Sequence, residues 1–206
     1  FVETAHFASG VMTHRTQYDA PGVDAADWTV IESFYDSLGQ LEREVTTLDT
    51  GVIQDETYVN GVLSYWVSYD DPGTNAMEWV VIEESFDEVG QLAVQTVTYD
   101  NGIIAESQYS DGVLNYHVEY DDPYSNAADW TRIESYYDPY TGALQAEVTF
   151  YDTGIIDEKM FDNGVLTHQV QYDDPYSNAA DWQQIERHYD PYTGELQAEI
   201  ATYDTG

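Results

Sequence analysis

Hydrophobic and polar residues alternate along short segments of this chain. Over residues 165–172, Leu166, Val170 and Tyr172 share one parity, and polar residues stand between them. A period of two with many β-branched and aromatic side chains is typical of a strand that buries one face. The alternation predicts half-buried β-strands, and it recurs in the corresponding segments 62–69 and 113–120.

These segments belong to a sequence repeat of 51 to 52 residues. A Gly-Val-Leu or Gly-Val-Met sequence recurs, and an acid-Trp pair follows it each time. The glycines are Gly10, Gly61, Gly112 and Gly164, and the tryptophans are Trp28, Trp79, Trp130 and Trp182. A fixed period of this size indicates one supersecondary unit stacked on copies of itself. We expect a single repeat array over residues 1–206, with approximate units 1–51, 52–102, 103–154 and 155–206.

Each repeat contains four alternating segments separated by turn sequences. Asn163-Gly164 and Asp152-Thr153-Gly154 are examples of the turns, and they favour hairpins because Gly and Asn accept a positive φ. We find no helical period. The sequence therefore predicts an all-β protein of about 16 short antiparallel strands, four in each repeat.

One strand has an irregular pattern near its end. Leu144, Val148 and Phe150 share a parity, whereas the recurrent Tyr151 falls on the opposite face. Either a β-bulge shifts the register there, or the strand is buried on both sides.

Two architectures fit a unit of four strands. Polar outward residues favour an elongated β-meander or solenoid-like array with one face in water. Phe1–Gly10 aligns with Ile155–Gly164, so the chain opens with a fourth strand and closes after a third. This offset allows the alternative of a four-bladed β-propeller closed by the N-terminal strand. It also allows that strand to complete a unit of a neighbouring molecule, which would build filaments by strand donation.

The composition adds a strong negative charge. The chain has 40 Asp and Glu against 5 Lys and Arg, which gives a net charge of -35. Such a chain repels nucleic acid and anionic membranes, and no stretch approaches the ~18 apolar residues of a spanning helix. We expect neither nucleic acid as a partner nor a membrane span. Self-repulsion of this size opposes folding unless salt or divalent cations neutralise it. The absence of Cys excludes disulfides and thiolate metal sites.

An Asp-Asp-Pro loop between the first and second strands of a repeat is the best candidate site. Ca²⁺ takes 6 to 8 oxygen ligands from carboxylates, carbonyls and water, and each of three loops offers such oxygens within nine residues. Asx and Ser turns that satisfy the loop backbone are the alternative interpretation. The first loop, residues 19–27, lacks the second Asp and the Ser, so we expect its site to be weaker or absent. The predicted Ca²⁺ ligands are Asp70, Asp71, Asn75, Glu78, Asp121, Asp122, Ser125, Asn126, Asp129, Asp173, Asp174, Ser177, Asn178 and Asp181.

A recurrent Ile-Glu pair in the second strand of each repeat is a further candidate. The Glu has the same parity as the preceding Trp, so the two would share a face. That face is either a solvated strand surface or a stripe that binds cations or sugars, with Trp as stacking platform and Glu as acceptor. The glutamates are Glu32, Glu83, Glu134 and Glu186.

Catalytic signatures are weak. The five histidines do not stand at metal-ligand spacings, and His14 and His168 occupy the slot held by Tyr65 and Tyr116 in other repeats. We expect them to pack within strands. No Gly-x-Ser-x-Gly, phosphate-loop or zinc motif appears, and we predict that the chain is not an enzyme.

The cadence Tyr-Asp-x-x-x-Gly-x-Leu at Tyr137–Leu144 and Tyr189–Leu196 resembles the Tyr-Asp repeats of RHS and teneurin-type shells. The repeat as a whole also resembles acidic tracts of large proteins that proteobacteria secrete alongside RTX calcium-binding repeats. The Gly-Gly-x-Gly-x-Asp nonapeptide is missing, so the RTX calcium roll itself is not implied. The resemblance implies an extracellular structural or adhesive tract that depends on calcium.

We therefore predict a secreted, non-enzymatic β-repeat module of a surface, matrix or adhesive structure. Ca²⁺ in the Asp-rich loops would stabilise it, and it would associate with itself or with a surface or matrix polymer. One alternative is a lectin-like, carbohydrate-binding propeller. Another is a structural protein whose acidity is an adaptation to high salt, with no specific metal. Because the chain begins at Phe1, we also expect a processed product or a piece of a longer protein.

Overall fold

The computed structural model describes residues 1–19, 26–71, 73, 76–122, 127–173 and 180–204. They form two compact units, Phe1–Asp100 and Asn101–Gly206. All of the regular secondary structure in the described residues is β-strand, which confirms the all-β prediction. Each unit holds two of the predicted repeats, and each repeat holds four strands.

The strands are seven to nine residues long and follow one another with short connections. The first unit contains β1 (Val2–Ala8), β2 (Val11–Tyr18), β3 (Trp28–Tyr35), β4 (Leu41–Leu48), β5 (Ile53–Val59), β6 (Val62–Tyr69), β7 (Trp79–Phe86) and β8 (Leu92–Tyr99). The second unit contains β9 (Ile104–Ser110), β10 (Val113–Tyr120), β11 (Trp130–Tyr137), β12 (Leu144–Tyr151), β13 (Ile155–Asp162), β14 (Val165–Asp173), β15 (Trp182–Tyr189) and β16 (Leu196–Tyr203).

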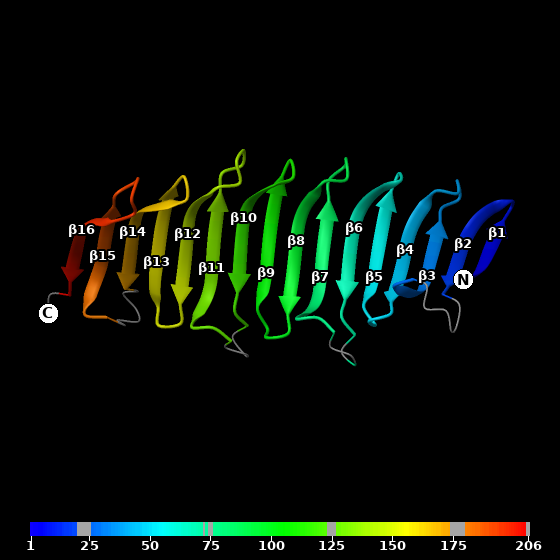
Figure 1. Cartoon of the computed structure of the whole chain (residues 1–206), viewed down its shortest axis with the longest axis horizontal. Coiled ribbons are helices and arrows are strands. Elements are labelled where there is room, and N and C mark those ends of the chain that lie inside the picture. The colour runs from blue at the N-terminus through cyan, green and yellow to red at the C-terminus, as the bar shows by residue number, and fades with distance from the viewer. Residues whose placement is uncertain (20–25, 72, 74–75, 123–126, 174–179, 205–206) are drawn as a thin grey trace. The chain divides into compact units, whose positions relative to one another are not determined.

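Within each unit the strands form an open antiparallel meander (Figure 1). Inside a unit, each strand except the two at its edges pairs with the strand before it and the strand after it, and the pairing continues from one repeat into the next. For example, β4 closes one repeat and is hydrogen-bonded to β5, which belongs to the next. A propeller would break into separate four-stranded blades, so the propeller alternative is wrong and the open meander is confirmed.

Tight hairpins form at the predicted Asn-Gly turns and at the equivalent positions of the other two repeats. Ser9, Asn60, Asp111 and Asn163 have φ between 50° and 53°, and the glycine after each has φ between 75° and 85°. Two successive positive φ angles make a type I′ turn, whose twist matches that of the flanking strands. These turns fix the register of the hairpins that they close.

β-Bulges explain the irregular parity near Tyr151. Trp130 pairs with Tyr151 and Arg132 with Phe150, so Thr131 is an extra residue without a partner position in β12. The predicted register shift is therefore present, but the extra residue near Tyr151 lies in β11. A second shift at the other end of this strand pair leaves Gln145 as the extra residue of β12. The same shift separates Trp28 from Val30, Trp79 from Val81 and Trp182 from Gln184.

One face of the second unit carries valines and glutamates in alternate strands, and we call it the Val–Glu face. Residues paired across strands project to the same side of a sheet, so the register defines its central row. Few hydrophobic side chains are deeply buried in the described chain, and two valines of this row are among them, Val118 at 1% exposure and Val170 at 6%. The row consists of Glu106, Val118, Glu134, Val148, Glu158, Val170, Glu186 and Ile200.

Candidate functional site

The first Asp of each Asp-Asp-Pro loop is buried at the end of its strand. Asp70, Asp121 and Asp173 are only 6%, 8% and 9% exposed. The Asp121 carboxylate accepts hydrogen bonds from the backbone N–H groups of Ala127 and Ala128, at 3.1 and 3.2 Å. Asp70 does the same in its own loop, and Asp173 accepts from Ala180 at 3.2 Å.

These bonds support the turn interpretation of the first Asp. The bonds give each buried carboxylate partners within its own loop, and a buried polar group without a partner would cost about 1–3 kcal/mol. A carboxylate oxygen has two lone pairs, so a bond to an N–H group does not prevent it from also binding a cation. The loops thus have a structural role whether or not calcium binds.

The remaining predicted calcium ligands divide into two groups. Asp71, Glu78, Asp129 and Asp181 are exposed and Asp122 is half-buried. Among the described residues, the loop carboxylates do not gather into a group of three that could hold a metal ion. The others, Asn75, Ser125, Asn126, Asp174, Ser177 and Asn178, lie outside the described residues.

The Glu of each Ile-Glu pair has a partner in the neighbouring strand or in its own. The Tyr65 hydroxyl donates to Glu83, and the Tyr136 hydroxyl donates to Glu134 at 2.7 Å. These bonds, together with burial, raise the pKa of each tyrosine to about 12. In the first repeat a histidine takes this position, with His14 Nε2 at 3.6 Å from Glu32.

In the fourth repeat, three side chains of types that can bind a metal ion lie together at this position. Nε2 of His168 and Nε2 of His188 both lie 3.0 Å from Oε1 of Glu186. The two imidazole rings are stacked, with centroids 4.8 Å apart and planes 24° from parallel. Ligand atoms of the three residues lie within 4.8 Å of one another. The expectation that histidines only pack within strands missed this group, which forms across the hairpin of β14 and β15.

The predicted Trp–Glu stripe does not form. Glu32 pairs with Val45 and Trp28 pairs with Leu48, and these partners are three residues apart in β4. Residues an odd number apart in a regular strand project to opposite faces, so the bulge after the Trp places it across the sheet from the Glu. A sugar-binding stripe made of these two residue types loses its geometric basis.

The opposite face carries basic residues with carboxylate partners. Lys159 Nζ donates to Glu147 at 2.7 Å, and Arg187 Nε donates to Glu199 at 2.8 Å. Burial lowers the pKa of Lys159, but the hydrogen bond and charge of Glu147 more than offset this and raise it overall. Since the chain has 5 Lys and Arg against 40 Asp and Glu, such pairs neutralise little of the total charge.

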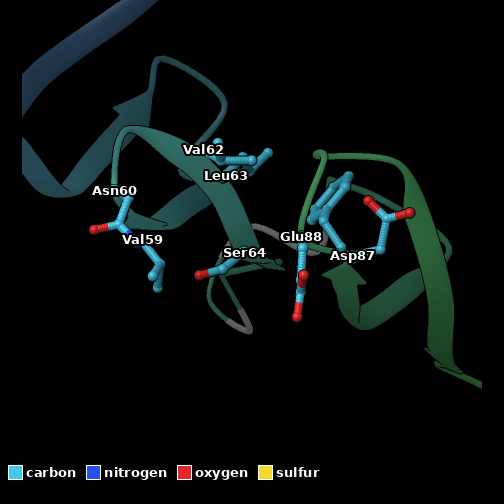
Figure 2. Close-up of a pocket in the computed structure, with 8 residues that line it drawn as sticks. Val59, Asn60, Val62, Leu63, Ser64, Asp87 and Glu88 are labelled. Carbon is cyan, nitrogen blue, oxygen red and sulfur yellow. The ribbon is translucent and has the colours of Figure 1, made fainter.

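A pocket of about 480 Å³ lies in the first unit between two turns (Figure 2). Val59, Leu63 and other residues of the β5–β6 hairpin line one side, and Asp87 and Glu88 line the other. Two of its polar side chains bond to the backbone, because the Ser64 hydroxyl donates to the Thr57 carbonyl at 3.0 Å and Asp87 accepts from two N–H groups of its own turn. Asn60 and Glu88 also line the pocket, so its walls are both apolar and polar.

Comparison with known proteins gives no family. No protein-family model matches the chain, and a search of curated proteins finds no match. The resemblance to Tyr-Asp repeat tracts stays a prediction. No helix in the described part of the chain is long and apolar enough to cross a membrane.

Proposed function

We propose that this chain is a non-enzymatic structural module that acts outside the cell and assembles through the edge strands of its sheets. The observation that best supports this proposal is the pairing of strands between repeats. β4 pairs with β5 and β12 pairs with β13 in equivalent registers, so the strand that ends one repeat is built to accept the strand that opens the next. β16 is a strand of the first kind and β1 is a strand of the second kind.

The equivalence predicts a specific register for two copies. In β12 and β13, Val148 pairs with Glu158. The corresponding residues are Ile200 in β16 and Thr4 in β1, so β16 of one copy would place Ile200 opposite Thr4 of the next. Strand addition of this kind draws its affinity from main-chain hydrogen bonds and its specificity from alternate side chains.

The exposed hydrophobic residues of these two strands support this proposal. All seven residues of β1 are exposed, including Phe7 at 65%. In β16, Leu196 is 53% and Ile200 56% exposed. An exposed strand edge with apolar side chains is a template for pairing with another chain. Assembly would cover these residues with a second strand.

Calcium in the acidic loops is part of the same proposal. Calcium modules outside cells bind with dissociation constants of about 10⁻⁴–10⁻³ M, and loops whose described carboxylates do not converge on one point suit that range. Neutralising loop charge would also weaken the repulsion between copies. Other divalent cations, or a surface or matrix polymer, are the partners that such a module would meet.

Sedimentation velocity of the 206-residue chain, in calcium and moderate salt, tests the proposed assembly. We expect species larger than the monomer. The double variant Thr4→Lys with Ile200→Lys would sediment as a monomer, because the proposed register puts like charges opposite each other. Thr4→Lys with Ile200→Glu would regain association, since the two charges then attract.

Two controls separate the edge pairing from general charge effects. Tyr140→Lys with Tyr192→Lys adds the same charge at turn residues that are 90% and 91% exposed, and its association should match the unaltered chain. Removal of residues 1–9 deletes all of β1 and should abolish association. A chain that assembles equally well without β1 would overturn the proposal.

A further inference from the structure

The group formed by His168, Glu186 and His188 has no role in the proposed assembly. It lies on the Val–Glu face, where Glu186 belongs to the central row and the two histidines are cross-strand partners. Their side chains are 28%, 31% and 46% exposed in the order His168, Glu186, His188. The group is therefore partly buried by its neighbours and still open to an ion from solvent.

Three donor atoms converge at this place. Both Nε2 atoms lie 3.0 Å from Glu186 Oε1. Tetrahedral Zn²⁺ with bonds of about 2.0–2.1 Å places its ligand atoms ~3.3 Å apart, so donors within 4.8 Å need shifts of about 1 Å or less each. Side-chain rotation supplies shifts of that size without a change in the strands.

The other repeats give an internal comparison. The third repeat has Tyr116 and Tyr136 at the positions of His168 and His188, around the equivalent Glu134. Those tyrosines also pair across the strands, with ring centroids 5.2 Å apart. The sheet therefore folds with tyrosines at this place, and packing alone does not require two histidines.

We propose that His168, Glu186 and His188 form a binding site for a transition-metal dication, with Zn²⁺ as the principal ligand. Two imidazoles and a carboxylate are a donor set for Zn²⁺, whereas Ca²⁺ takes oxygen ligands, so this site is distinct from the acidic loops. The ion takes the place of the protons between the imidazoles and the carboxylate. Water fills the remaining coordination position, and the bound ion ties β14 to β15.

Isothermal titration of the chain with Zn²⁺, in an excess of CaCl₂ that occupies weak carboxylate sites, tests the proposal. We expect one Zn²⁺ per chain and a higher Tm. The double variant His168→Tyr with His188→Tyr reproduces the side chains of the third repeat and should fold. Its Zn²⁺ affinity should be lower by at least about tenfold, since even partners outside the ligand shell contribute about that much.

A second readout identifies the ligand atoms. Zn²⁺ should shift the ¹⁵N resonances of Nε2 in His168 and His188, and Glu186→Gln should weaken binding while it keeps the shape of the side chain. His14→Tyr is the matched control in the first repeat, and its Zn²⁺ binding should equal that of the unaltered chain. Equal Zn²⁺ affinity in the double histidine variant, or unshifted His168 and His188 resonances at saturation, would overturn the site. Neither result depends on whether copies assemble through β1 and β16.

Discussion

At the scale of single residues, carboxylate side chains of Asp and Glu serve different purposes in this chain. Asp121 is buried and holds its loop, whereas Glu83 lies on a strand and accepts from a tyrosine. Asp138 and Asp190 accept N–H groups of their turns, which lowers the pKa of each. Stability from a lowered carboxyl pKa is present above the unfolded value and is lost as pH falls through the folded one.

The Tyr65–Glu83 pair predicts a titration at high pH. The bond to Glu83 and burial raise the Tyr65 pKa to about 12, above the value of about 10 for an unfolded chain. The stability from this pair is therefore fully present below pH ~10 and is lost as pH rises through ~12. In Glu83→Gln, the ¹³Cζ resonance of Tyr65 should titrate nearer pH ~10.

Tyr136 in the other unit serves as the control for this titration. Glu134 raises its pKa to about 12, and Glu83→Gln leaves that pair intact. Its titration should be the same in both proteins. An unchanged Tyr65 midpoint in Glu83→Gln would show that burial, rather than the carboxylate, sets the raised pKa.

At the scale of the strand and turn, glycines with positive φ connect the strands. Gly61 follows Asn60 in a type I′ hairpin and has φ of 78°. Gly90 lies in the β7–β8 turn with φ of 84°, and a Cβ there would stand 3.1 Å from Cγ1 of Val62. The β7–β8 turn thus packs onto Val62 of the Gly-Val-Leu sequence. This contact explains why the turn glycine and the valine recur together in the repeats.

Substitution of the two glycines should separate strain from packing. Gly61→Ala meets no atom within 4 Å, so its free energy of unfolding should fall by about 1–2 kcal/mol from backbone strain alone. Gly90→Ala should cost more, because Val62 must also move. Urea unfolding measures both.

A double-mutant cycle identifies the contact. Val62→Ala removes the atom that the new Cβ would meet, so the added cost of Gly90→Ala over Gly61→Ala should shrink in that background. Equal costs for the two glycine variants in the unaltered chain would contradict the packing of the turn on Val62.

At the scale of the whole chain, charge dominates. A net charge of -35 over 206 residues repels itself, and all of the basic residues together offset only 5 charges. Screening by salt and binding of calcium both reduce this repulsion, but only the effect of binding depends on which cation is present. Calcium stabilisation and adaptation to high salt are thus distinguishable hypotheses.

Thermal unfolding should distinguish them. Millimolar CaCl₂ should raise Tm by more than KCl of equal ionic strength with a chelator present, because specific binding adds to screening. The triple variant Asp71→Ala, Asp122→Ala and Asp174→Ala should keep the KCl response and lose the extra calcium response. The first loop, with Ala20 at this position, shows that the repeat accepts the change. Identical responses to the two salts would favour salt adaptation without a specific metal.

The sequence by itself determined the repeat, the strands and the tight turns. Alternation along residues 165–172 and the Asn163-Gly164 turn are local signals, because side chains on a strand alternate and Gly accepts a positive φ. The offset of the first strand follows from the same local pattern. The choice between an open meander and a closed propeller does not, because it was decided by the pairing of β4 with β5. The acidic loops were also visible as candidates, since their carboxylates are close together in the sequence.

Only the tertiary structure decided which side chains meet across strands. The bulge at Thr131 and its equivalents put each recurrent Trp on the opposite face from its Glu, against the simple parity. The register of β14 and β15 brings His168 beside His188, 20 residues away, and places Glu186 between their nitrogens. Parity along one strand cannot give such neighbours, because they depend on how far each strand slides against the next.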